Sequence, residues 1–150
     1  MNEKIQDLIN SLTWPGINSI TFSDGRITLL DVEFYGDQNY FIGPIADTTI
    51  ESYLKYNEDN LSNFDFAQKI VSDEYEIAVG DGSGESNGII YVWNLERDEL
   101  AWFCFFESSE PFKSVSADKQ SVKAVAANGI CWAVDISDPL KIQIIYPPES

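Results

Sequence analysis

Apolar residues near the N-terminus recur at helical spacing. Their offsets of 0, 3, 4 and 7 place them on one side of an α-helix. These residues are Ile5, Leu8, Ile9 and Leu12. Pro15 follows shortly afterwards, and a proline disfavours the helical conformation in the residue before it. The pattern predicts an amphipathic helix over residues 3–12.

The second half of the chain has the pattern of a β-sheet. Residues 89–93 and 100–106 are aromatic and β-branched runs that are apolar at odd and even positions alike. Such runs are typical of central strands that are covered on both faces, and residues 75–79 alternate like a further strand. Residues 80–88 between the strands are rich in glycine and serine, which predicts a flexible loop.

A hairpin and a final strand follow. Residues 122–127 and 130–136 flank Asn128-Gly129, a strong hairpin signal because both residues tolerate positive φ. Residues 141–146 form the last predicted strand, which ends before two prolines.

The first half is less regular. In residues 27–34 the apolar phase changes, because Ile27 and Leu29 lie on one face whereas Leu30 lies on the other. This change predicts a β-bulge or a strand covered on both sides. A short strand at residues 40–42 is expected to stop at Gly43-Pro44.

Two further segments of the first half concern helices. Residues 49–56 fit a helix or a strand equally well. Residues 61–71 carry apolar residues at Leu61, Phe64 and Ile70, and we interpret this spacing as a second helix.

Together these patterns predict one domain, residues 1–150, of the α+β class and predominantly β. We expect one or more twisted, mostly antiparallel sheets with an N-terminal helix and one further helix near residues 61–71. No apolar run approaches the roughly 20 residues that a membrane helix needs. The start, Met1-Asn2-Glu3-Lys4, lacks the basic flank and apolar stretch of a secretory signal, so we expect a cytoplasmic protein that binds no membrane.

The net charge of the chain restricts the classes of molecule that it is expected to bind. Twenty-five acidic residues against nine basic ones give a net charge of −16. Residues 58–110 alone hold thirteen acids and two bases. Such a field repels nucleic acid and anionic lipid and attracts basic proteins or cations. The alternative interpretation is that the acids only keep the protein soluble.

The residues present argue against most catalysis. Histidine is absent, which removes the commonest general base and every Ser-His or Cys-His nucleophile pair. Carboxylate pairs such as Asp31 with Glu33, or Asp135 with Asp138, could serve a glycosidase, but such spacing more often marks the solvated face of a strand. We therefore expect no enzyme.

Metal and cofactor sites are not expected either. Oxygen ligands alternate from Asp81 to Asn87, but the glycine and glutamate that a calcium loop requires at its sixth and twelfth positions are replaced by Ser86 and Val92. Cys104 and Cys131 lie in apolar strands and are interpreted as core residues, with a disulfide between them left open. We expect no metal and no cofactor.

Carboxylates interleaved with aromatic residues form the candidate partner-binding site. Aromatic side chains supply desolvated contact area, and a carboxylate fringe attracts a basic partner and fixes its orientation. The candidate residues are Asp73, Glu74, Tyr75, Glu76, Asp81, Glu85, Glu96, Asp98, Glu99, Trp102, Glu107 and Glu110.

An acidic, β-rich chain of this size without catalytic residues resembles the immunity proteins of bacterial polymorphic-toxin and contact-dependent inhibition systems. The resemblance implies a cognate basic toxin, most often a nuclease, whose active site the acidic protein covers. Two alternatives stay open: a carboxylate-dependent enzyme or cation- or sugar-binding module, and a DNA mimic that inhibits a DNA-binding protein. Direct binding of nucleic acid is not expected, because phosphate contacts need Lys and Arg.

Overall fold

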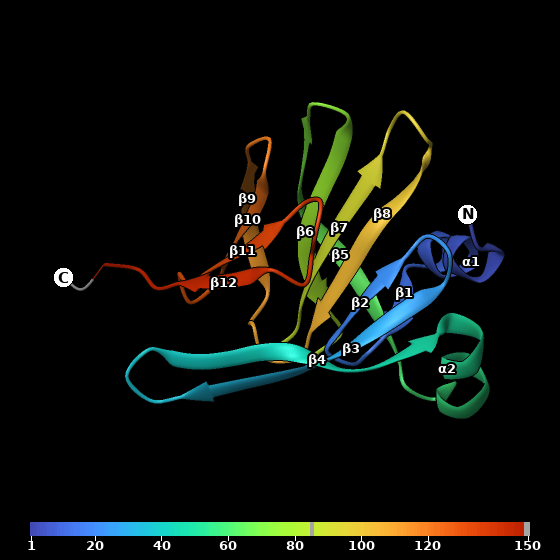
Figure 1. Ribbon diagram of the computed structural model, residues 1–150, viewed down its shortest axis with the longest axis horizontal. Coiled ribbons are helices and arrows are strands. Elements are labelled where there is room, and N and C mark those ends of the chain that lie inside the picture. The colour runs from blue at the N-terminus through green and yellow to red at the C-terminus, as the bar shows by residue number, and fades with distance from the viewer. Residues whose placement is uncertain (85, 149–150) are drawn as a thin grey trace.

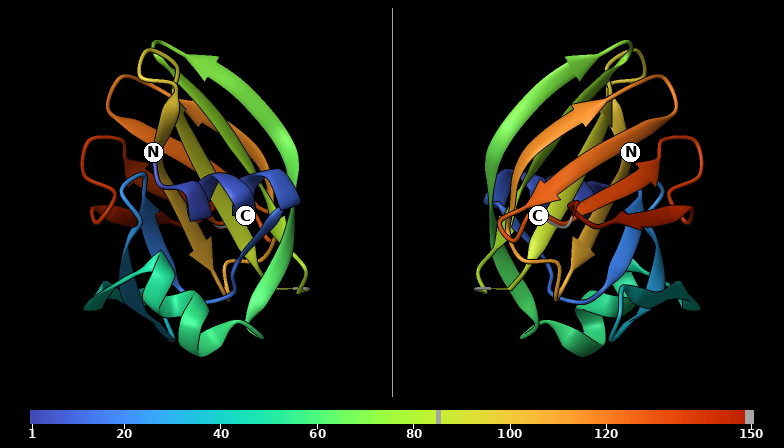
Figure 2. Two further views of the ribbon diagram at one scale, coloured as in Figure 1. Left: turned by 90° about the vertical axis from the view of Figure 1, so that its right-hand side faces the viewer. Right: turned by 90° about the vertical axis from the view of Figure 1, so that its left-hand side faces the viewer.

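The protein consists of two antiparallel β-sheets and two helices, as seen in a computed structural model that describes residues 1–84 and 86–148. The two sheets pack face to face, and helices α1 and α2 lie on the opposite face of the larger sheet (Figures 1 and 2). The larger sheet therefore forms the middle layer of the molecule.

The larger sheet has eight strands in the order β1-β5-β6-β7-β8-β2-β3-β4. In chain order they are β1 (Thr13–Pro15), β2 (Ser19–Phe22), β3 (Arg26–Tyr35), β4 (Asn39–Thr49), β5 (Leu61–Ser72), β6 (Tyr75–Gly82), β7 (Gly88–Asn94) and β8 (Glu99–Phe106). The smaller sheet has the order β12-β11-β10-β9. Its strands are β9 (Phe112–Ala117), β10 (Ser121–Ala126), β11 (Cys131–Asp135) and β12 (Ile142–Ile145). The predicted β-rich class with mostly antiparallel pairing is confirmed.

The N-terminal helix α1 (Glu3–Ser11) is confirmed at the predicted place. The Asn2 side-chain oxygen accepts the N–H groups of Lys4 (2.9 Å) and Ile5 (3.3 Å), which otherwise lack partners within the helix. The helix ends where Leu12 adopts a left-handed conformation with φ of 54°.

The second helix lies elsewhere than predicted. α2 spans Ile50–Asn57, where the pattern fitted helix and strand equally, and the Thr49 hydroxyl caps it by accepting the Ser52 N–H at 3.2 Å. The helix predicted near residues 61–71 is wrong, because this segment is strand β5. Leu61 and Phe64 pack beneath the helices whereas Ile70, beyond a β-bulge between Phe66 and Gln68, packs against the core between the sheets, so these apolar residues do not share one helical face.

The central strands are buried on both faces, as their composition predicted. In β8, Trp102, Cys104 and Phe106 point into the core between the two sheets. Phe103 and Phe105 point to the other face, into a core that α1 and α2 complete. Both cysteines are free thiols, with Cys104 buried and Cys131 partly buried.

Local irregularities shape the outer strands. Of the two alternatives predicted for residues 27–34, β3 is the strand covered on both sides, since Ile27 and Leu29 pack beneath the helices and Leu30 packs between the sheets. The register shift beside Leu30 places the extra residue, Ile45, in β4.

Gly129 turns the predicted β10–β11 hairpin with φ of 84°. The predicted loop over residues 80–88 is shorter than expected, because β6 continues through Gly82. The predicted stop at Gly43-Pro44 is wrong, since β4 continues through it. β4 ends the strand order of the described sheet, and proline is tolerated on such an edge because its missing N–H leaves no inner ladder bond unmade.

The close approach of β5 and β6 generates a stability prediction. A Cβ at Gly80 would stand 1.8 Å from the Asp65 carbonyl oxygen, so Gly80→Ala must displace backbone. We expect this variant to lower the free energy of unfolding by about 3 kcal/mol in urea titrations followed by tryptophan fluorescence. At Gly36 a Cβ would meet nothing within 4 Å, so Gly36→Ala is the control and should change the value by less than about 1 kcal/mol. Equal effects of the two substitutions would contradict this packing.

Candidate functional site

The candidate residues divide between the two ends of the eight-stranded sheet. The β5–β6 and β7–β8 turns lie at one end and carry Asp73, Glu74, Glu96 and Glu99. Asp81, Glu107 and Glu110 lie at the opposite end, beyond the far ends of β6 and β8. Strand β8 is about 24 Å long at the usual rise per residue, so the two groups are well separated. Glu85 lies outside the described residues.

A groove joins the residues at the first end. This turn-end groove has a volume of about 480 Å³ and runs between the β5–β6 turn, the β7–β8 turn and the loop after β11. Its polar walls include Glu74, Glu96 and Glu99 together with Arg97. A neighbouring depression of about 380 Å³ adds Asp73. The structure thus brings four of the predicted carboxylates to one surface.

Backbone contacts hold the two turns in place. The Leu95 N–H donates to the Glu74 carbonyl oxygen at 2.8 Å and so ties one turn to the other. The Asn94 side-chain oxygen accepts the N–H groups of Glu96 and Arg97, each at 3.0 Å. These bonds occupy backbone groups and leave the Glu96 carboxylate exposed to solvent.

Tyr75 is one of three aromatic residues that line this groove, with Phe22 and Trp102. Its side chain is partly buried at the start of β6. Burial raises the pKa of the Tyr75 phenol, and the nearby charges of Glu74 and Glu96 raise it further, while Arg97 opposes them. The two carboxylates outnumber the one guanidinium group beside this ring, and such a balance of charge would attract a cation.

Trp102 does not serve this groove as an exposed anchor. Only 2% of its surface is exposed, and its indole N–H donates to the Ile136 carbonyl oxygen at 2.9 Å. Its ring belongs to the core between the sheets. The buried position follows from the alternation of β8, which the apolar run on both faces concealed in the sequence.

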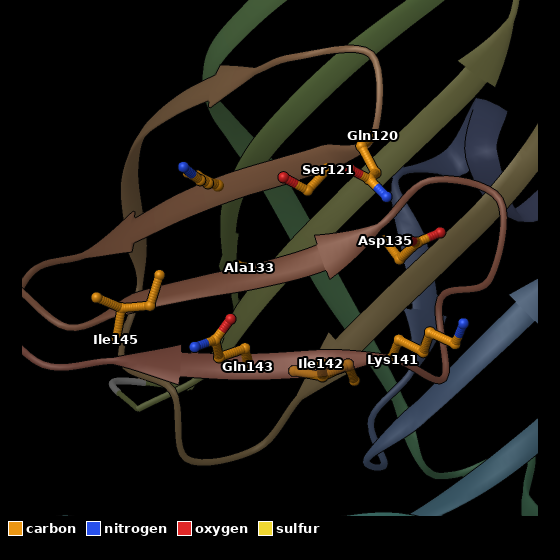
Figure 3. Close-up of a pocket in the computed structure, with 9 residues that line it drawn as sticks. Gln120, Ser121, Ala133, Asp135, Lys141, Ile142, Gln143 and Ile145 are labelled. Atoms are coloured by element: carbon orange, nitrogen blue, oxygen red, sulfur yellow. The ribbon is translucent and has the colours of Figure 1, made fainter.

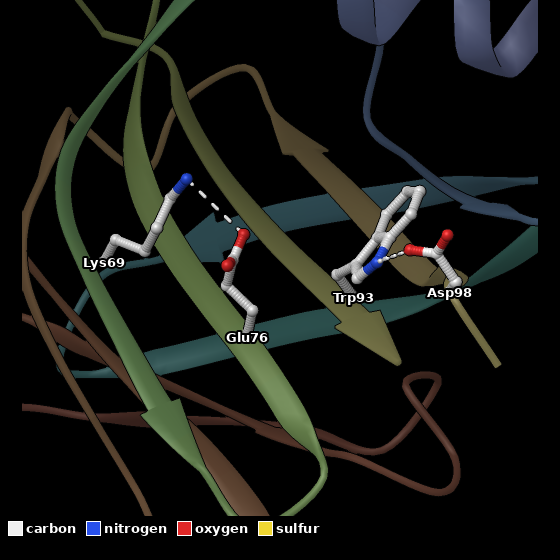
Figure 4. A network of polar contacts seen from close by, with 4 residues as sticks. All are labelled: Lys69, Glu76, Trp93 and Asp98. Atoms are coloured by element: carbon white, nitrogen blue, oxygen red, sulfur yellow. Dashed lines mark hydrogen bonds and ion pairs between the residues drawn. The ribbon is translucent and has the colours of Figure 1, made fainter. Parts of the chain in front are cut away.

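Glu76 and Asp98 lie apart from the groove, on the helix-facing side of the sheet (Figure 4). Glu76 pairs with the Lys69 ammonium group at 3.4 Å. Asp98 accepts the Trp93 indole N–H at 3.3 Å. Both carboxylates therefore have a partner within the protein.

The three candidates at the opposite end differ in their settings: one is held by hydrogen bonds, one lies in a loop, and one lines a shallow hollow. Glu107 exchanges hydrogen bonds with Asn18, since its carboxylate accepts the Asn18 N–H (3.3 Å) and its own N–H donates to the Asn18 side chain (2.7 Å). Glu110 adopts positive φ in the loop before β9, and Asp81 lines a shallow hollow with Asp65.

The negative charge belongs to one part of the molecule. Residues 1–111, which form the helices and the larger sheet, contain twenty-one acids and five bases. Residues 112–150 contain four of each. The outer face of the smaller sheet has a hollow of about 450 Å³ with mixed charge, lined by Lys123, Asp135 and Lys141 among others (Figure 3). The negative field of the protein therefore originates from the helices and the larger sheet.

One exposed surface was not predicted from the sequence. The β3–β4 hairpin continues past the neighbouring strands and runs alongside the smaller sheet (Figure 1); we call residues 30–45 the β3–β4 arm. One face of the arm carries Asp31, Glu33, Tyr35 and Phe41. Tyr35 is 54% exposed and Phe41 is 49% exposed. The alternation in residues 31–35 could be recognised in the sequence, but the sequence did not indicate which of the two faces is exposed to solvent.

Hydrogen bonds stabilise the charged form of several carboxyl groups. Among the carboxyl groups with a shifted pKa are Glu51, Asp118 and Asp135, and each is lowered by hydrogen bonds that stabilise the charged form, whereas a general acid needs a raised pKa. In residues 1–84 and 86–148, no three acidic or cysteine side chains gather closely enough to hold a metal ion. None of the described helices is long and apolar enough to cross a membrane.

Comparison of the chain with protein-family models, with curated proteins and with solved structures gives no match.

The groove generates a titration prediction. Because Glu74 contributes to the raised pKa of Tyr75, we expect Glu74→Gln to lower that pKa towards the ordinary value of a tyrosine. Burial of the ring should still keep the pKa above that ordinary value. The Tyr75 Cζ chemical shift, followed by NMR through alkaline pH, measures the change. Glu58→Gln removes a charge at the end of α2 and should leave the titration of Tyr75 unchanged. An unaltered curve in the Glu74 variant would show that its charge does not reach the phenol.

Proposed function

We propose that this protein is an immunity protein, which binds a basic bacterial toxin domain and neutralises it by covering its active site. The toxin domain expected from this charge is a nuclease. The inhibitor performs no chemistry in this mechanism, since occlusion of the active site is sufficient.

The observation that carries the proposal is the unneutralised charge of the larger sheet. Residues 1–111 hold twenty-one acids, yet within the described part of the chain the structure records a single ion pair, Lys69 with Glu76. Self-repulsion of this size destabilises a compact state. A basic partner would relieve it on binding, so the free protein has an electrostatic preference for the complex.

A nuclease domain supplies the complementary chemistry. Its active site must present Lys and Arg to the phosphates of its substrate. Carboxylates at fixed positions can pair with the same groups, as Glu74, Glu96 and Glu99 of the turn-end groove are placed to do. Their long-range field also speeds encounter with a positive partner. The DNA-mimic alternative uses the same charges and differs only in its target.

The experiment is capture followed by kinetics. The tagged protein is used to purify bound proteins from a lysate of its source, and a captured basic protein is assayed for nuclease activity with and without the inhibitor. We expect stoichiometric binding and loss of nuclease activity. Capture of no basic protein, or capture of one whose activity survives saturation, would contradict the proposal.

Salt dependence tests the electrostatic part. Between about 0.02 M and 0.5 M salt the screening length shortens about five-fold. We expect the association rate constant to fall about ten-fold or more while the dissociation rate constant changes much less, as measured by stopped flow and surface plasmon resonance.

A matched pair of variants locates the charges that act. The triple substitution Glu74→Gln, Glu96→Gln and Glu99→Gln should slow association more than the triple substitution Glu3→Gln, Asp7→Asn and Glu58→Gln, which removes equal charge elsewhere. Equal rates for the two variants would mean that the turn-end groove has no special part in steering.

A further inference from the structure

The outer face of the β3–β4 arm is an exposed sheet face with aromatic side chains. Directly paired residues of antiparallel strands share a face, and Glu33 pairs with Phe41. Asp31 and Tyr35 lie on the same face at alternate positions of β3. Tyr35 is 54% exposed to solvent and Phe41 is 49% exposed.

The inner face of the arm holds it in position. The Phe34 ring meets the Trp132 ring edge to face, with centroids 5.8 Å apart. The Ile144 N–H donates to the Tyr40 hydroxyl oxygen at 3.1 Å, and Val32 packs against the core between the sheets. The arm is thus fixed to the smaller sheet, so its outer face is ordered before any partner arrives. Such preorganisation lowers the entropic cost of binding.

The chemistry of the outer face is acidic as well as aromatic. The Tyr35 hydroxyl donates to the Glu33 carboxylate. This hydrogen bond raises the pKa of Tyr35, and the charges of Glu33 and Asp31 raise it further. Residues 27–54 contain five acids and neither lysine nor arginine. An arginine or lysine of a partner could stack on an exposed ring and pair with the adjacent carboxylate.

We propose that the outer face of the β3–β4 arm is the anchoring surface on which a basic protein docks. This inference rests on the proposed function and assigns it a contact surface. The turn-end groove has the denser charge, but its tryptophan is buried and its tyrosine is partly buried. The arm combines carboxylates with exposed rings, which are the residue types that dominate binding energy when a partner desolvates them.

Docking occurs through side chains and not through an added strand. β4 is the last strand of the described sheet order, so its outer edge is the natural place for strand addition. Pro44 has no N–H to donate, and the bulge that leaves Ile45 between the paired residues Pro44 and Ala46 interrupts the ladder. These interruptions affect the edge of β4 and leave the side chains on the outer face of the arm accessible.

The test is NMR mapping on the full-length protein with a defined probe, a short synthetic peptide that alternates arginine and leucine. We expect its amide shift changes to centre on residues 31–43. The double substitution Tyr35→Ala with Phe41→Ala should weaken the peptide about ten-fold. Asp31→Asn with Glu33→Gln should weaken it and reduce its salt dependence.

Matched variants serve as controls. Tyr56→Ala with Val71→Ala removes two other exposed apolar side chains, and Glu58→Gln with Asp59→Asn removes two other exposed charges. Both should bind the peptide like the unmodified protein, and melting curves of all variants report that they are folded.

Three outcomes overturn the arm as anchor: shift changes centred on the turn-end groove, equal weakening by the control variants, or no binding of the peptide. The proposed function is judged separately. Capture and inhibition of a basic nuclease that binds the arm variants as tightly as the unmodified protein would leave that function intact and overturn only the arm.

Discussion

The alternation of large side chains along β8 is the constraint on which the rest of the structure depends. Trp102, Cys104 and Phe106 fill the space between the sheets, and Phe103 and Phe105 fill the space beneath the helices. Removing a single strand would therefore open both cores at once. Aromatic packing reinforces this layer, because the Phe103 ring stacks on Trp14 with centroids 3.9 Å apart, and the Phe106 ring lies 4.4 Å from that of Trp132.

This apolar middle layer allows the surface to carry an unbalanced charge. Stability comes from burial on two sides of one sheet, so the acidic residues need not form internal ion pairs, which contribute little at exposed positions in any case. The charge is also unevenly placed, since residues 112–150 are neutral in total. The smaller sheet acts as a support for the arm, and the larger sheet and the arm present the charge.

Sequence patterns identified the elements whose signals are local. Helix α1, the doubly covered strands β7 and β8 and the β10–β11 hairpin follow from spacing and turn chemistry within a few residues. The patterns failed where a bulge changes which face the side chains occupy, as in β5. They also failed where a proline is tolerated because its strand lies at the edge of the sheet, as at Pro44 in β4. Both depend on how a strand pairs with its neighbours in the sheet, which the spacing of residues within one strand does not report.

The candidate site was predictable in kind but not in position. Acids and aromatics adjacent in sequence were expected to lie together, but an antiparallel strand carries residues such as Glu99 and Glu107 to opposite ends of the sheet. Burial of Trp102 and exposure of Tyr35 were equally hidden, because both lie in runs with rings at neighbouring positions. Only the packing of the second sheet decides which face of each strand meets water.

The two-sided construction of the β3–β4 arm bears on how such a protein can change over evolutionary time. Val32, Phe34 and Tyr40 attach the arm, whereas the intervening Glu33 and Tyr35 point away from both cores. Substitutions at the outward positions can therefore accumulate with little loss of stability. A lineage could exchange one recognition specificity for another on this scaffold while the inward residues keep the fold unchanged.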